Sequence, residues 1–296
     1  MIMWGAPIWL YLFLAGMAGG AYFSAFLVEH FSGEANRRLL RVAACLGVPL
    51  AGLGVLLLVA DLGEPFRFWH LLLRFELISA MSMGTWILSA FVAVAMAIAI
   101  LWLAELRVAQ PAIRRLVRPA TNALALIGFV FALMLMVYTG VLLATTSKAL
   151  WAGTVLLPPL FVASATSTGL ALLIIVAATV PALGTPGRTV SQLAEADAVV
   201  ILVELSTLLA YALALGESTM PGALDGLRLL TTGALAVPFW VGVVLLALLV
   251  PLQLEVSNWG RGIEIRSVWR AITLSSGCVL LGGLILRAVI VIGGQM

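Results

Sequence analysis

The stretch "LISAMSMGTWILSAFVAVAMAIAILWL", residues 77–103, contains no Asp, Glu, Lys, Arg or His. A helix needs about 20 consecutive apolar residues to cross the hydrocarbon core of a bilayer, and this stretch is longer than that. The rest of the sequence has the same character, since 63% of its 296 residues are hydrophobic and only 10% are charged. Soluble domains average about 25% charged residues. We therefore expect this protein to fold in lipid.

Seven further apolar runs are long enough to cross a membrane. With the first stretch, the eight runs are 7–29, 39–60, 77–103, 119–143, 154–180, 197–216, 228–250 and 271–292. Strands of a membrane barrel would instead alternate apolar and polar residues over about 10 residues. No basic segment precedes the first run, so we expect a membrane span there rather than a removable signal peptide. The sequence predicts an all-α integral membrane protein with eight transmembrane helices.

Weak internal similarity suggests that the helices form two units. "LFLAGMAGG" from Leu12 resembles "LFVASATST" from Leu160, and the Leu-Gly-Glu after the second run recurs after the sixth at a similar offset. These matches predict two four-helix bundles of parallel topology, 1–146 and 147–296.

Basic residues predict the orientation. The loops opposite the termini carry 11 of the 16 Lys and Arg residues: Arg37, Arg38, Arg41, Arg107, Arg114, Arg115, Arg118, Arg188, Arg261, Arg266 and Arg270. Cytoplasmic loops are enriched in such residues, so both termini should lie outside the cytoplasm. The formal charge of +3 follows from this topology and gives no reason to expect a nucleic-acid partner.

Charge gathers in one short segment, "DLGEPFRFWHLLLRFE", residues 61–76. Its ionisable residues are Asp61, Glu64, Arg67, His70, Arg74 and Glu76. Pro65 suits a helix start, and the segment 65–75 reads as an amphipathic helix lying at the outer interface. It could anchor the protein to headgroups, or its basic face could dock a partner.

Further polar and aromatic residues should reach the same interface. Tyr138 and Lys148 flank the end of the fourth span, and Tyr11 lies near the start of the first. Tyrosines often form an interfacial belt. Their convergence with the charged segment instead suggests a hydrogen-bonding site for a lipophilic ligand with carbonyl oxygens, which describes a quinone.

Residues within the spans leave two readings open. Gly16 belongs to a small-residue face that allows close helix packing or leaves room for a flat ligand. Glu204 and Arg287 are ionisable groups in the middle of apolar runs, and such groups are candidates for functional sites. They could form a structural ion pair or a proton relay.

Cysteine and histidine give no sign of a metal centre. Cys45 and Cys278 lie in separate apolar runs and form no CxxC motif. His30 and His70 are expected at opposite membrane faces, so they cannot ligate one haem. We expect no haem and no metal in this protein.

Five stretches resemble the NrfD/PsrC family, the integral membrane subunits of polysulfide-reductase-type molybdoenzyme complexes. They are "YLFLAGMAGGAY" (11–22), "DLGEPFRFWH" (61–70), "SAMSMGTW" (79–86), "YTGVLL" (138–143) and "LRAVIVIGGQ" (286–295). The resemblance covers most of the sequence.

The resemblance implies two four-helix bundles in a bacterial or archaeal cytoplasmic membrane, with both termini on the outer side. It also implies that menaquinone or a similar quinone binds near the outer face. By position, Tyr138 matches a quinone-bonding tyrosine and Asp61 an acidic residue of the site. Tyr11 stands where relatives carry a quinone-contacting His, and Ile8 where they carry Asn.

The resemblance further implies an iron–sulfur (ferredoxin-like) subunit and a molybdopterin catalytic subunit as partners. We expect Tyr138, Tyr11, His70, Gly16 and Asp61 to bind the quinone. Partner docking is expected at Arg67, Arg74, Glu64 and Lys148, and proton transfer at Asp61, His70, Glu76, Glu204 and Arg287. The alternatives are a secondary transporter, whose polar site would lie near the midplane, and a purely structural anchor.

Overall fold

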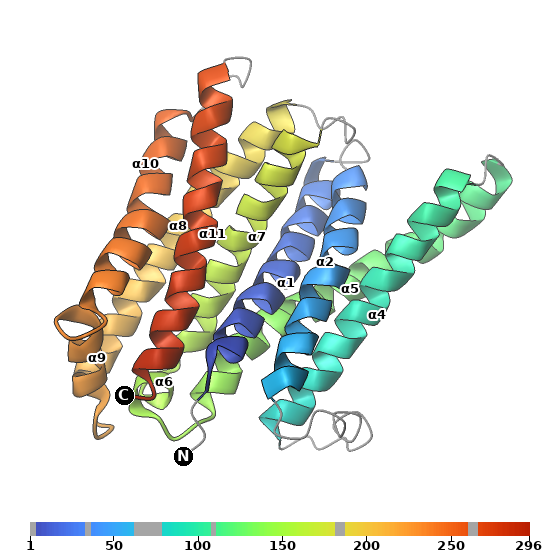
Figure 1. The fold of residues 1–296 in the computed structure, drawn as a ribbon. Helices are drawn as coiled ribbons and strands as arrows, with labels where there is room; N and C mark the ends of the chain where they lie inside the picture. Colours follow the sequence, from blue (N-terminus) through green and yellow to red (C-terminus); the bar gives the residue numbers. More distant parts are fainter. Residues whose placement is uncertain (1–3, 33–36, 62–78, 108–110, 181–186, 260–265) are drawn as a thin grey trace.

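A computed structural model of the protein describes residues 4–32, 37–61, 79–107, 111–180, 187–259 and 266–296. All regular elements in these ranges are helices (Figure 1). Eight helical segments among them are long and apolar enough to cross a bilayer. The predicted fold class, an all-α membrane protein with eight spans, is confirmed.

The spans are divided between the two halves of the sequence. The first half contains α1 (Ala6–Ser32), α2 (Arg37–Asp61), α4 (Ala80–Arg107) and α5 (Pro111–Ala144). The second half contains α7 (Leu157–Thr179), α8 (Gly187–Glu217), the π-type segment η4 (Pro238–Leu249) continued by α10 (Val250–Ser257), and α11 (Arg266–Gly293). Two short helices, α6 (Ala149–Ala152) and α9 (Ala223–Thr231), precede α7 and η4.

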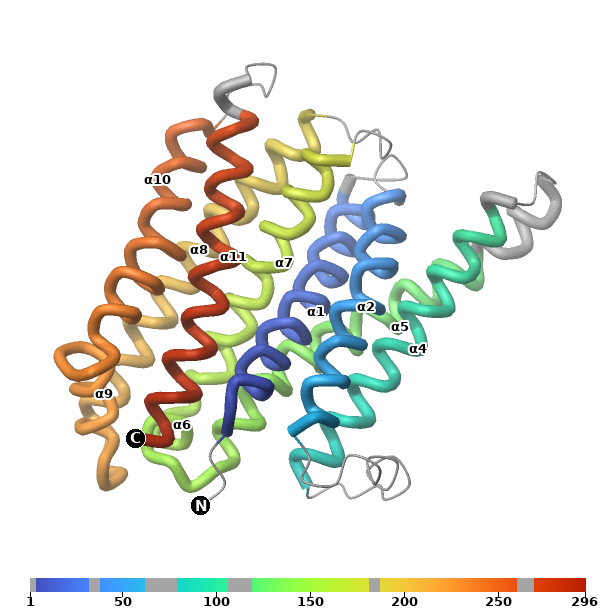
Figure 2. The backbone as a smooth tube through the Cα atoms, in the orientation of Figure 1, coloured from blue at the N-terminus to red at the C-terminus, as the bar shows by residue number. Residues whose placement is uncertain are grey.

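Both termini lie at the same end of the bundle, as an even number of spans requires (Figures 1 and 2). The short helices α6 and α9 lie at this end, which we call the terminal end. At the opposite end, α4 and α5 lean away from the other helices as a pair. The terminal end is therefore the face where helices from both halves of the sequence converge.

The centre of the molecule is built by α1 and α7, the most buried of the eight spans at 72% each. Small residues let their backbones touch. A Cβ atom at Gly20 would overlap the carbonyl of Ala165, and one at Gly169 would overlap the backbone of Gly20 and Ala21. In lipid, helix association depends on close van der Waals packing of this kind. The small-residue face of the first span thus packs against another helix at Gly20.

Helix contacts follow the two halves of the sequence but also cross between them. The helices α1, α2, α4 and α5 are neighbours, as are α7, α8, η4 with α10, and α11. However, α1 also packs against α7 and α11, and α5 packs against α7. The division into two four-helix bundles at residue 146 therefore stays a prediction.

Two spans differ in position from the apolar runs that predicted them. The sixth begins at Gly187 rather than at residue 197. The seventh occupies Pro238–Ser257 rather than 228–250, because the first part of that run belongs to the separate helix α9. The two shifts add Glu195 to the sixth span and Glu255 to the seventh.

Candidate functional site

Tyr138 lines a cavity of about 460 Å³ between α4 and α5, close to the terminal end. Nine residues line it: Ala80, Met83, Ile87, Leu133, Met134, Val137, Tyr138, Val141 and Thr145. The Thr145 hydroxyl already donates to the Leu142 carbonyl, at 3.1 Å. Tyr138 is 7% exposed, and among the described residues no protein group pairs with its phenol oxygen. The cavity is thus an apolar slot with one uncommitted hydrogen-bonding group.

Gly84 holds the Tyr138 ring in place from α4. A Cβ atom at this position would overlap the phenol ring and its oxygen. The ring can lie against the α4 backbone only because residue 84 has no side chain. The stretch "SAMSMGTW" therefore contributes a glycine that shapes the cavity.

Tyr11 lies on the other side of Tyr138, almost fully buried. The two phenols are close enough to interact electrostatically. A Cβ atom on Gly54 of α2 would lie 3.0 Å from the Tyr11 ring. Tyr11 thus fills the space between α1 and α2, next to the residue that lines the cavity.

Asp61 is the exposed last residue of α2. It lies seven residues beyond Gly54, which corresponds to about 10 Å of helix rise toward the terminal end. Its carboxylate is 3.8 Å from the Cβ position of Gly5, just before α1. Asp61 therefore lies between the Tyr11–Tyr138 pair and the aqueous phase at that end.

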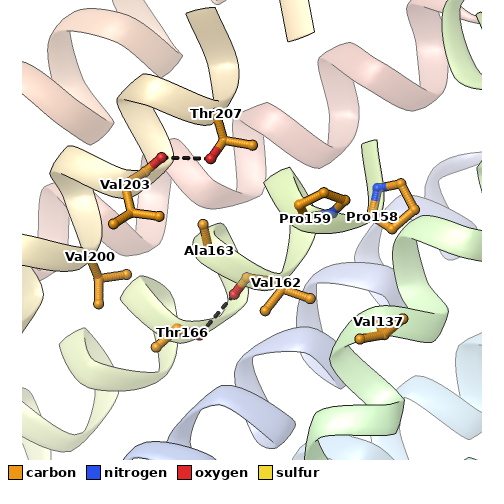
Figure 3. Close-up of a pocket in the computed structure, with 9 residues that line it drawn as sticks. All are labelled: Val137, Pro158, Pro159, Val162, Ala163, Thr166, Val200, Val203 and Thr207. Atoms are coloured by element: carbon orange, nitrogen blue, oxygen red, sulfur yellow. Dashed lines mark hydrogen bonds between the residues drawn. The ribbon is translucent and has the colours of Figure 1, made fainter. Parts of the chain in front are cut away.

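A second cavity, of about 490 Å³, lies on the other side of Val137 between α5, α7 and α8 (Figure 3). Its threonines hydrogen-bond their own helices: Thr166 donates to Val162 at 2.8 Å and Thr207 donates to Val203 at 2.7 Å. Pro158 and Pro159 complete one wall. Because its hydroxyls are engaged, this cavity offers less to a polar headgroup than the Tyr138 cavity does.

Aromatic residues join the two termini at the same end. Trp4 stacks on Trp151 with ring centroids 5.1 Å apart, and the indole of Trp151 donates to the Ile290 carbonyl at 2.7 Å. The Gln295 amide donates to the Trp4 carbonyl at 3.0 Å. Lys148, a predicted docking residue, precedes α6 beside this group and is partly exposed.

Five predicted site residues lie outside the described residues. They are Glu64, Arg67, His70, Arg74 and Glu76, together with the predicted interfacial helix 65–75.

Gly16 does not line the Tyr138 cavity. A Cβ atom at this position would lie 3.4 Å from Ala165 and 3.5 Å from the guanidinium of Arg287. Gly16 thus faces α7 and α11, where its missing side chain leaves room for Arg287.

Arg287 and Glu204 meet through Ser164. Arg287 is fully buried and donates to the Ser164 hydroxyl and to the Phe161 carbonyl, at 3.3 Å. Its guanidinium carbon lies 4.8 Å from the centre of the Phe161 ring. Ser164 in turn hydrogen-bonds Glu204, which also interacts electrostatically with Arg287. The two predicted intramembrane groups are therefore partners.

Two acids of this region, Asp197 and Glu255, were missed by the sequence reasoning. Asp197 is 0% exposed and accepts from Ser167 at 2.7 Å. Glu255 is 3% exposed and accepts from Ser275 at 2.8 Å. They lie on α8 and α10, which pack against each other. Asp197 is the first residue of the run 197–216 and Glu255 lies five residues beyond the run 228–250, so hydropathy gives no reason to single them out.

Comparison with known proteins identifies the family. The profile of the family described as "Polysulphide reductase, NrfD" matches residues 1–296. The protein is 31% identical to the C subunit of polysulfide reductase from Wolinella succinogenes, over 99% of this sequence and 95% of that subunit. It is also 31% identical to protein NrfD of Escherichia coli, over 100% of this sequence and 96% of that protein. This protein therefore belongs to the NrfD polysulphide reductase family.

Proposed function

We propose that this protein is the quinone-binding membrane subunit of a multi-subunit respiratory oxidoreductase. Its family membership and eight spans support the role of membrane anchor. The observation that carries the finer proposal is the Tyr138 cavity, an apolar slot whose phenol has no hydrogen-bond partner among the described residues.

The cavity suits a quinone in size and chemistry. Its volume of about 460 Å³ falls within the range of roughly 300–1,000 Å³ that is usual for small-molecule sites. An apolar lining matches a lipophilic ring and tail, and a phenol can donate to a carbonyl oxygen or accept from a hydroxyl. Menaquinone or another quinone fits these features.

A bound quinone would supply two-electron, two-proton redox chemistry at this place. Within the protein, Tyr138 would orient the headgroup by a hydrogen bond, with Gly84 fixing the position of its ring. Tyr11, next to Tyr138, would exclude water from the α1 side. Asp61 and His70 would exchange protons with the aqueous phase at the terminal end, and Glu76 would assist them.

The proposed partner is an iron–sulfur subunit that passes electrons between the quinone and a molybdopterin catalytic subunit. By its name, the relative from Wolinella succinogenes is one subunit of a multi-subunit enzyme. The terminal end is the docking surface we propose, with Arg67, Arg74, Glu64 and Lys148 contacting the partner. We place this end on the outer side of a bacterial or archaeal cytoplasmic membrane.

Two other functions predict different behaviour. A secondary transporter would move a substrate as an isolated protein, and its site would lie near the midplane. The Tyr138 cavity lies instead near one end of α4 and α5, which favours a quinone site. A purely structural anchor would contain no quinone.

Quinone analysis of the gently purified protein tests the proposal. We expect stoichiometric quinone in the wild type and a lower content in Tyr138→Phe, because loss of one hydrogen bond costs about 0.5–1.5 kcal/mol, or about twofold to tenfold in affinity. Tyr22→Phe is the matched control, since the Tyr22 phenol bonds the Ala125 carbonyl at 3.2 Å, away from the cavity. No quinone in any intact sample, or equal content in all three proteins, would contradict the proposed site.

A further inference from the structure

The cavity between α5, α7 and α8 is lined by apolar side chains and two threonines (Figure 3). The hydroxyls of Thr166 and Thr207 donate to carbonyls of their own helices. Its other lining residues are Val137, Pro158, Pro159, Val162, Ala163, Val200 and Val203. No lining side chain therefore has a hydrogen-bond donor to spare, so the cavity suits a hydrocarbon chain.

Val137 lines both this cavity and the Tyr138 cavity. It precedes Tyr138 in α5, and its side chain is 37% exposed. The two cavities thus meet over the exposed side of Val137. A chain that leaves the Tyr138 cavity can reach the second cavity over this side chain, without passing through the backbone of α5.

The second cavity extends from the terminal end toward the middle of the membrane. Pro158 lies in the first turn of α7, at the terminal end. Thr166 lies eight residues further along α7, which corresponds to about 12 Å of helix rise. Tyr138 lies six residues before the end of α5, at the terminal end. A chain that starts beside Tyr138 and follows the cavity therefore runs inward, as the tail of an interfacial headgroup must.

The start of α7 disfavours the headgroup of a phospholipid. A helix N-terminus can bind phosphate through its unpaired backbone N–H groups. Pro158 and Pro159 lie in the first turn of α7 and have no N–H group. None of the lining residues of the cavity is Lys or Arg. The cavity therefore offers neither hydrogen bonds nor positive charge to a phosphate.

The cavity is accessible from the bilayer. Val203 on α8 is 51% exposed, and Pro159 on the facing wall is exposed as well. A hydrocarbon chain can therefore enter sideways from the lipid.

We propose that this cavity binds the isoprenoid tail of the quinone whose headgroup lies at Tyr138, an inference that rests on the proposed function. The tail crosses Val137 and lies between α7 and α8. In lipid, burying a hydrocarbon chain gains little from the hydrophobic effect, so binding depends on van der Waals fit. The shape of the cavity thus favours quinones with a tail over quinones without one.

Photolabelling of the full-length protein in lipid tests the position of the tail. The probe is a naphthoquinone with a diazirine on its isoprenoid tail, and peptide mass spectrometry locates the label. We expect label within residues 158–166 and 200–207, and an excess of unlabelled menaquinone should reduce it. Label confined to α4 and α5, or label at the expected residues that menaquinone does not reduce, would overturn the proposal.

A photoreactive phospholipid provides the comparison with bilayer lipid. We expect its labelling of residues 158–166 and 200–207 to fall when menaquinone is added, because the tail occupies the cavity. Equal phospholipid labelling with and without menaquinone would assign the cavity to bilayer lipid and overturn the proposal.

A matched pair of variants on α8 tests the contribution of the cavity to affinity. Val203→Trp fills the cavity, whereas Leu202→Trp adds the same side chain at a neighbouring position that is 47% exposed and lies outside the lining. We expect Val203→Trp to weaken binding of menaquinone about fivefold or more, as overpacking usually costs. Leu202→Trp should bind menaquinone as the wild type does, and both variants should bind a naphthoquinone without a tail equally well.

The quinone without a tail separates the two possible failures. If menaquinone binds equally to all three proteins, the tail site is wrong, and the headgroup site stands as long as Tyr138→Phe weakens binding of both quinones. If neither quinone binds to the wild type, the proposed function fails and the tail site fails with it. Unchanged binding of the quinone without a tail also shows that Val203→Trp is folded.

Discussion

Gly84 shapes the Tyr138 cavity together with the tyrosine itself. Gly84 permits the phenol ring to lie on the α4 backbone. We expect Gly84→Ala to displace the ring, lower the quinone content and cost about 1–3 kcal/mol in stability, as overpacking usually does. Quinone analysis and thermal unfolding measure both effects.

Gly52→Ala is the control for this substitution. Gly52 is on α2 near the same end, and a Cβ atom there would meet nothing within 4 Å. Since Ala favours helix over Gly by about 1 kcal/mol, this variant should be as stable as the wild type or slightly more stable. If both variants have the same quinone content and the same stability, the contact between residue 84 and Tyr138 affects neither.

The buried charge of Arg287 makes a second prediction at the level of residues. Removing one partner of a buried ion pair leaves the other charge uncompensated, at a cost of about 3–5 kcal/mol. Arg287→Leu should therefore lower the stability strongly, and Arg287→Leu/Glu204→Leu should recover much of the loss. Unfolding midpoints in detergent compare the variants, and a double variant no more stable than the single one would show that Glu204 is not the group left unpaired.

The sequence gives a reason to single out some buried polar residues and no reason to single out others. Tyr138 and Tyr11 are singled out by their expected depth near the outer interface and by the resemblance to the NrfD/PsrC family, since Tyr22 and Tyr211 also lie in apolar runs. Asp197 and Glu255 were missed because the first begins an apolar run and the second lies beyond one, where a charged residue is common. Their importance depends on which side chains face them across α8, α10 and α11, and that information is absent from a single sequence.

Helix bounds were predictable where a run has a sharp edge and uncertain where it does not. The third span, predicted at 77–103, lies at Ala80–Glu105. The run 228–250 merges two elements, because α9 ends at Thr231 and a turn follows before Pro238. Thr, Gly and Ala in that turn have nearly the hydropathy of a helix interior, so the break cannot be detected by hydropathy alone.

The crossing of α1 and α7 makes a prediction at the level of elements. Gly20→Ala would place a methyl group within the carbonyl of Ala165 and force the two helices apart. We expect a loss of about 1–3 kcal/mol, measured as a lower unfolding temperature in detergent. Gly277→Ala on α11 has open space and should leave that temperature unchanged or raise it. Equal unfolding temperatures for the two variants would mean that α1 and α7 can move apart at Gly20 without loss of stability.

The number of spans was predictable because hydropathy acts over the entire sequence, and the orientation in the membrane stays a prediction. We expect alkaline phosphatase fused after the C-terminus to be active, since both termini should lie outside the cytoplasm. A fusion after Thr179, at the end of α7, should be inactive there, whereas green fluorescent protein at the same point should fluoresce. The reverse pattern would invert the membrane orientation.

The contacts of α1 have a consequence for biogenesis. Helix α1 leaves the ribosome before α7 and α11, against which it packs in the folded protein. Until they arrive, the glycine-rich side of α1 remains open to lipid. In a fragment that ends at Thr146, the glycine-rich side of α1 would stay exposed to lipid. We expect pulse–chase labelling to show that this fragment is degraded faster than the full-length protein. Quality-control proteases would then distinguish unfinished from finished copies by a surface that only the completed protein covers.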